Sequence, residues 1–91
     1  MVRRDDIRRV RANLGRRIHD LREAQGWSQY KFAQIVPIDR TYLIGIEKGR
    51  RNPTVDNLIK ISQGLGVSLS DLCIGVEYDS GAEGQETEGS R

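Results

Sequence analysis

Glycine and proline divide this chain into short stretches in which apolar residues recur at steps of three and four. In the first stretch, which spans 5–25, the recurring residues are Ile7, Val10, Leu14, Ile18 and Leu21. This spacing places them on one face of a helix and leaves the arginines on the other face. Gly26 then supplies the positive-φ position at which helices end. The stretch therefore predicts a first helix over Asp5 to Gln25, and no alternating strand pattern competes with it.

The second and third predicted helices are short and lie close together in the chain. Ser28 can accept a hydrogen bond from the free amides of a helix that begins at Gln29. Pro37 ends this helix after about eight residues, because proline lacks an amide hydrogen and disfavours helical geometry in the residue before it. Asp39 can cap a third helix over 40–48. The interior residues of the two helices are Phe32, Ala33, Val36, Leu43 and Ile46.

Two further helices and a polar tail complete the chain. Thr54 can cap a fourth helix that ends at Gly66 and buries Leu58, Ile61 and Leu65. Ser68 and Asp71 resemble a capping box that opens a short fifth helix through 72. Residues 75–91 contain hardly any apolar side chain, and such a composition cannot offset its ordering entropy. The sequence therefore predicts an all-α fold, with one compact five-helix domain over 1–74 and a disordered acidic tail over 75–91.

The charge of the chain is divided between these two parts. Residues 1–74 carry 14 Lys and Arg against 8 Asp and Glu, a net charge of +6, whereas residues 75–91 carry 1 against 5. A basic domain favours a polyanionic partner without identifying the polyanion. Nucleic acid and an anionic membrane surface both fit this charge.

Several classes of protein are excluded by what the sequence lacks. Cys73 is the only cysteine and His19 the only histidine, so one chain can assemble neither an internal disulfide nor a zinc site with several such ligands. No apolar stretch approaches the roughly 18 residues of a membrane span, and no apolar segment follows the arginine-rich start as in a signal peptide. Paired acids and a nucleophile with its base are also missing. We therefore expect no enzyme, no metal, no cofactor and a cytoplasmic protein.

Two short helices joined by a tight turn, with flanking helices as a core, can hold one helix at the surface. We expect the third helix to be the exposed one and to enter the major groove of double-stranded DNA. Its outward positions lie at the end of the helix that first meets base edges, and they are Arg40, Thr41, Ile44 and Gly45. Arg40 can form two hydrogen bonds to guanine O6 and N7, and Thr41 can contact thymine or either type of base.

Between Leu14 and Leu72 the chain contains a series of short motifs. They are Ser28-Gln29, Ala33, Ile38, Asp39-Arg40-Thr41-Tyr42-Leu43, Gly45-Ile46-Glu47-Lys48-Gly49 and Arg51-Asn52-Pro53-Thr54. Together they resemble the phage repressor and Cro-type helix-turn-helix family, also called XRE. The resemblance implies a repressor-like DNA-binding domain. Proteins of this type are repressors, activators, restriction-modification controllers or DNA-binding antitoxins, and they usually act as dimers on palindromic sites.

The resemblance also implies roles for individual residues. The expected phosphate contacts are Gln29, Tyr42, Lys48, Arg50, Arg51 and Asn52. Gln29 would bind its phosphate at the positive end of the second helix. Glu47 would instead pair with Arg22 of the first helix in a partly buried salt bridge. We assign this pair to structure, because removing one partner leaves the other charge buried and unpaired.

Two positions within the helix-turn-helix need a physical explanation. The family usually has a left-handed glycine where this chain has Pro37, and proline cannot adopt a positive φ. The turn must then be one residue longer, or Val36 must be extended. Gly45 costs about 1 kcal/mol relative to alanine inside a helix. Close approach of the protein backbone to DNA and crowding between helices would each explain this glycine.

The start of the chain carries a group of arginines with two possible roles. They are Arg3, Arg4, Arg8, Arg9 and Arg11. A solvated helix face with ion pairs such as Asp5 to Arg9 is the first possibility. A minor-groove arm or an additional phosphate contact is the second.

Two functional hypotheses follow from these observations. The leading one is a transcription regulator that binds a palindromic operator as a homodimer, as a repressor or a restriction-modification controller. The alternative is a DNA-binding antitoxin that neutralises a partner toxin with its tail or first helix. The neighbouring reading frame would distinguish the two.

Overall fold

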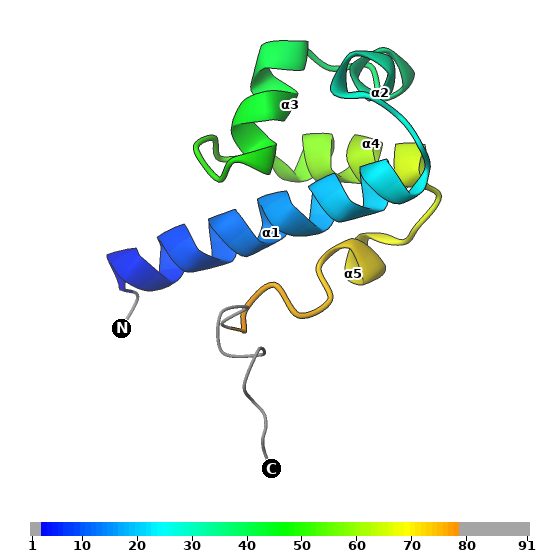
Figure 1. Cartoon of the computed structure of the whole chain (residues 1–91). Helices are drawn as coiled ribbons and strands as arrows, with labels where there is room; N and C mark the ends of the chain where they lie inside the picture. Colours follow the sequence, from blue (N-terminus) through cyan, green and yellow to red (C-terminus); the bar gives the residue numbers. More distant parts are fainter. Residues whose placement is uncertain (1–2, 79–91) are drawn as a thin grey trace.

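A computed structural model describes residues 3–78 of the chain (Figure 1). Over this range the chain forms five helices and no strand, which confirms the predicted all-α fold. The helices are α1 (Arg4–Ala24), α2 (Gln29–Ile35), α3 (Arg40–Glu47), α4 (Val55–Leu65) and α5 (Leu69–Leu72). Residues 79–91, which make up most of the predicted tail, lie outside the described residues.

The four shorter helices begin at the caps that the sequence predicts. The side-chain oxygens of Ser28, Asp39, Thr54 and Ser68 each accept a hydrogen bond from the amide three residues later. Each bond satisfies one of the amides that the start of a helix leaves without a partner. Local chemistry therefore sets where these helices begin.

The core is aliphatic apart from Phe32, on whose ring Trp27 stacks with the centroids 5.6 Å apart. The buried apolar residues are Leu14, Ile18, Phe32, Ala33, Val36, Leu43, Ile46, Ile61, Leu65 and Leu72. In Figure 1, α3 stands above the middle of the long α1, and α5 lies below α1. The core therefore fixes α3 against the middle of α1 and leaves the other side of α3 at the surface.

The turn between α2 and α3 is built without the extended residue that we considered. Val36 has helical dihedrals, with φ −66° and ψ −34°. The amide of Ile38 then bonds to the carbonyl of Ala33 at 2.9 Å, which closes the turn five residues back. No described residue other than glycine has a positive φ. Pro37 is therefore accommodated because the chain reaches α3 without a left-handed residue.

Both ends of the described chain differ from expectation. Ile7, which the periodicity assigned to the apolar face of the first helix, is 44% exposed, because the first turns of α1 extend beyond the core. Residues 75–78, which the composition assigned to the tail, form turns against α1. The side chain of Asn13 holds them there by donating hydrogen bonds to the carbonyls of Val76 and Tyr78.

Candidate nucleic-acid interface

α3 is fixed to the core by one side and exposed on the other. Leu43 is 0% exposed and Ile46 is 1% exposed. Arg40 and Thr41 are exposed on the outer side, where Ile44 and Gly45 are half-buried. The four expected base contacts therefore share an accessible strip on a helix whose opposite side is anchored in the core. A helix anchored in this way presents its outer side chains with little freedom to tilt.

Gly45 is covered by a side chain of the chain itself. A Cβ atom at this position would overlap Cγ of Arg51. The backbone amides of Arg50 and Arg51 both bond to the carbonyl of Gly45, at 2.8 and 3.2 Å. Intramolecular crowding by Arg51 therefore accounts for the glycine inside α3.

Arg51 is held in place by a second contact, with Tyr42. Its guanidinium carbon lies 5.1 Å from the centre of the Tyr42 ring, within the range of a cation–π interaction. The Tyr42 hydroxyl donates to the carbonyl of Asn52 and accepts from Nδ2 of Asn57, both at 3.3 Å. The Tyr42 hydroxyl, an expected phosphate contact, thus already donates its hydrogen within the chain. We did not anticipate Asn57, because its partner lies fifteen residues away in the chain.

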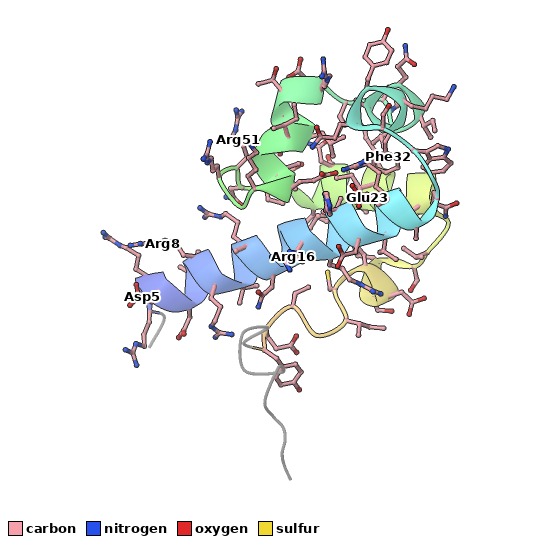
Figure 2. All side chains as sticks on the ribbon, viewed as in Figure 1. Asp5, Arg8, Arg16, Glu23, Phe32 and Arg51 are labelled. Carbon is pink, nitrogen blue, oxygen red and sulfur yellow. The ribbon has the colours of Figure 1, made fainter. Side chains whose placement is uncertain are left out.

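The remaining basic residues of the interface gather at the C-terminal end of α3. Lys48, Arg50, Arg51 and Asn52 are exposed, in the segment that links α3 to α4. Figure 2 shows Arg51 beside this loop, on the outer side of α3. None of these three cations, nor Arg40, forms an ion pair with a residue in 3–78. They therefore form a positively charged border along the accessible strip.

Behind α3, a buried polar network joins α1 to the end of α3. Arg22 is 5% exposed, and its Nε donates to Oε2 of Glu47 at 2.7 Å. A second guanidinium nitrogen donates to Oε1 of Glu47 at 3.0 Å. The third donates to the carbonyl of Trp27 at 2.7 Å. Arg22 and Glu47 thus form a bidentate salt bridge, and this geometry fits the structural role that we assigned to the pair.

Gln29 and His19 complete this network. Nε2 of Gln29 donates to Oε1 of Glu47 at 3.0 Å, so an expected phosphate contact also supports the bridge from α2. Nδ1 of His19 lies 3.2 Å from Oε1 of Glu47 and 3.1 Å from a guanidinium nitrogen of Arg22. The sequence indicated only that His19, as the single histidine, cannot build a zinc site with other histidines. Its position one helical turn before Arg22 is the pattern that could have suggested a shared partner.

The network changes the proton affinities of the bridge. Burial raises the pKa of the Glu47 carboxyl, but hydrogen bonds from Arg22, Gln29 and His19 outweigh burial and hold this pKa below its ordinary value. The hydrogen bond to Glu47 in turn raises the pKa of Arg22. Both groups are therefore charged at neutral pH, and α1, α2 and α3 meet at an ion pair.

No metal site or membrane-spanning helix is found in the described part of the chain. Within 3–78, no three His, Cys, Asp or Glu residues are grouped so that they could hold a metal ion. No helix there is long and apolar enough to cross a bilayer. Cys73 is a free, half-buried thiol.

Comparison with known proteins agrees with this geometry. A family model described as helix-turn-helix matches residues 18–72. The control protein C.MunI of a Mycoplasma species is 42% identical over 71 residues, which cover 77% of this chain and 96% of that protein. The control protein C.BamHI of Bacillus amyloliquefaciens is 39% identical over 69% of this chain and 79% of that protein. Among solved structures, the restriction-modification controller protein C.AhdI from Aeromonas hydrophila superposes with a TM-score of 0.66 at 34% identity, covering 67% of this chain and 92% of that chain.

Proposed function

This chain belongs to the helix-turn-helix family, and on that premise we propose that it is a transcription regulator that binds double-stranded DNA in a sequence-specific manner. The proposal depends on the way in which α3 packs on the core. Leu43 and Ile46 of this helix are buried, whereas Arg40 and Thr41 are exposed on its outer side. A helix held in this way can enter the major groove while it stays packed on the core.

Four residues of α3 form the strip proposed to face the bases, and three of them would contact bases with their side chains, whereas Gly45 is covered by Arg51. Arg40 and Thr41 are exposed at the N-terminal end of the helix, and Ile44 and Gly45 follow one turn later on the same strip. Arg40 would recognise guanine through O6 and N7, and Thr41 would meet thymine or a hydrogen-bonding base edge. Ile44 would add an apolar contact, which suits a thymine methyl group.

The residues around this strip are proposed to bind phosphates. Lys48, Arg50, Arg51 and Asn52 support this role by being exposed and free of acidic partners in 3–78. Gln29, the first residue of α2, donates one Nε2 hydrogen to Glu47 and keeps a second for a phosphate. Tyr42 lies within α3, and its hydroxyl would have to release the carbonyl of Asn52 in order to donate to a phosphate. Contacts of this kind fix the orientation of the protein on the duplex and carry no base information themselves.

A homodimer on a palindromic operator is the proposed assembly. One copy of α3 reads only a few base pairs, and two copies about 34 Å apart would read half-sites separated by one turn of the duplex. The relatives C.MunI and C.BamHI are control proteins, and the structural neighbour C.AhdI is a restriction-modification controller. Control of a restriction-modification operon is therefore the form of regulation that the relatives favour, and none of these names favours the antitoxin alternative.

Selection of bound duplexes from a random pool tests this proposal. We expect the wild-type chain to enrich a symmetric sequence whose half-sites lie about 10 base pairs apart. In the Arg40→Ala variant the position read by Arg40 should become degenerate, at a cost of about 1–3 kcal/mol in discrimination, while the rest of the site is retained. A pool with no enriched sequence would refute sequence-specific binding. An asymmetric product would refute the dimer alone.

A further inference from the structure

Three arginines form a row along the N-terminal part of α1. Arg4, Arg8 and Arg11 are spaced by four and three residues, which places them on one face of the helix. Arg4 and Arg8 are exposed, and Arg11 is half-buried. Together with Ile7 they line a shallow hollow at the surface. We call these three residues the arginine row.

The arginine row differs from Arg9 and Arg17, whose guanidinium groups bind other residues of the chain. Arg9 pairs with Asp6 at 3.3 Å and donates to the carbonyl of Glu77. This pair replaces the Asp5 to Arg9 pair suggested by the sequence. Arg17 donates to the carbonyl of Asp71 at 2.7 Å. The row forms no ion pair or side-chain hydrogen bond with any residue in 3–78, so its charges remain available to an external anion.

The row ends at Arg11, where α1 meets the segment that links α3 to α4 and carries the proposed phosphate contacts. At Gly49 a Cβ would lie 2.9 Å from Cα of Ala12, so the loop after α3 packs directly on α1 next to Arg11. Arg11 and Asn52 also line a second surface hollow together. In Figure 1 the first turns of α1 extend past this loop, and in Figure 2 Arg8 and Arg51 lie toward the same side of the molecule.

We propose that Arg4, Arg8 and Arg11 bind backbone phosphates of the duplex outside the base pairs that α3 reads. The inference rests on the proposed DNA-binding function and extends its footprint. From Arg4 to Arg11 the row covers about 10 Å of helix axis. The row carries three guanidinium groups, so it can neutralise up to about three phosphates. The matched helix-turn-helix region begins at residue 18, so the row adds a contact surface that the family model does not cover.

The test compares the whole wild-type chain with a triple variant, Arg4→Gln, Arg8→Gln and Arg11→Gln. Glutamine keeps nearly the helix propensity of arginine and removes the positive charge. Binding is measured against salt on two duplexes that carry the selected sequence, one with about ten extra base pairs on each side and one trimmed to the site. On the long duplex the log–log salt slope should flatten by about 0.9 for each phosphate that the variant no longer neutralises, or about 2.7 per protomer. Between about 50 and 200 mM salt, the affinity of the wild-type chain should therefore fall about 40-fold further per protomer than that of the variant.

The trimmed duplex and a single-charge pair supply the controls. On the trimmed duplex the two proteins should have the same salt slope, because the flanking phosphates are absent. Arg8→Gln should flatten the slope on the long duplex, whereas Arg16→Gln should not, since Arg16 lines a hollow with residues 74–76 on another side of α1.

Equal slopes for wild type and triple variant on the long duplex would overturn the inference. A loss of dimer in sedimentation by the triple variant would also overturn it, because the row would then serve assembly. In both cases the enriched operator would leave the proposed function standing, whereas absence of specific binding by the wild type would remove that function itself.

Discussion

At the scale of single residues, Arg51 is a charged side chain whose position is fixed before any ligand arrives. Its aliphatic part lies over Gly45, and its guanidinium lies against the ring of Tyr42. Holding a long side chain in one conformation reduces the rotamer entropy that binding must otherwise cost. The glycine in α3 therefore contributes to the interface through the arginine that it accommodates.

A double-mutant cycle tests this coupling between Gly45 and Arg51. Gly45→Ala should displace Arg51 and weaken DNA binding by about tenfold, while helix propensity in α3 improves by about 1 kcal/mol. In an Arg51→Ala background the same change at residue 45 should have almost no effect on affinity, because there is no side chain left to displace. Affinities of the four proteins for one duplex complete the cycle. Equal reductions in both backgrounds would mean that Gly45 acts by approaching the DNA directly.

At the scale of the helices, α3 is joined to its neighbours by a polar bridge as well as by the core. Glu47 is the last residue of α3, and it accepts hydrogen bonds from Arg22 of α1 and Gln29 of α2. A buried pair of this kind stabilises little in net terms but is costly to break from one side. Its role is to fix the end of α3 relative to the two helices that support it.

Acid should weaken this connection in a way that one substitution can isolate. The pKa of Glu47 is lower in the folded chain than in the unfolded chain, so the bridge contributes fully above the unfolded value of about 4.5 and is lost as pH falls through the folded value. We expect Glu47→Gln to lose about 3 kcal/mol of unfolding free energy at neutral pH, because Arg22 is left without its counter-charge. Below about pH 4 the difference between wild type and variant should shrink. Urea unfolding at a series of pH values measures it, and a constant difference would show that Glu47 is not the titrating group.

At the scale of the whole molecule, α1 and α3 approach each other so closely that their backbones nearly touch. Gly15 lies in the middle of α1, and a Cβ there would overlap the carbonyl oxygen of Ile46 and lie 2.6 Å from that of Glu47. Only a residue without a side chain lets the two backbones come this near. The separation of the two helices, and with it the height at which α3 stands above α1, depends on this contact.

Enlarging Gly15 should therefore disturb the entire domain. Gly15→Ala gains helix propensity in α1 but overpacks two backbone carbonyls, so we expect a net loss of about 3 kcal/mol of unfolding free energy. Gly26→Ala is no matched control, because that glycine has a φ of +80°. Ala24→Gly is preferable, because it changes one methyl group at an exposed position of the same helix. Thermal unfolding compares the three proteins, and a Gly15→Ala variant as stable as wild type would show that α1 and α3 can separate without cost.

The sequence alone determined the elements of this protein. The caps at Ser28, Asp39 and Thr54 and the helix-ending Gly26 and Gly66 act on neighbouring residues, so their effects can be predicted without knowledge of the fold. The periodicity of the apolar residues likewise predicted most of the core. The exposed strip of α3 followed from the same spacing, because a helix with one buried side must present the other.

Tertiary structure decided how the polar residues are used. Gln29 turned toward Glu47, Arg51 covered Gly45, and Asn13 joined residues 75–78 to α1, and in each case the partners are separated along the chain. Such contacts depend on the distances and angles between packed helices, to which local propensity contributes no information. The spacing of a helix shows which side chains share a face, but only the assembled fold shows what that face meets.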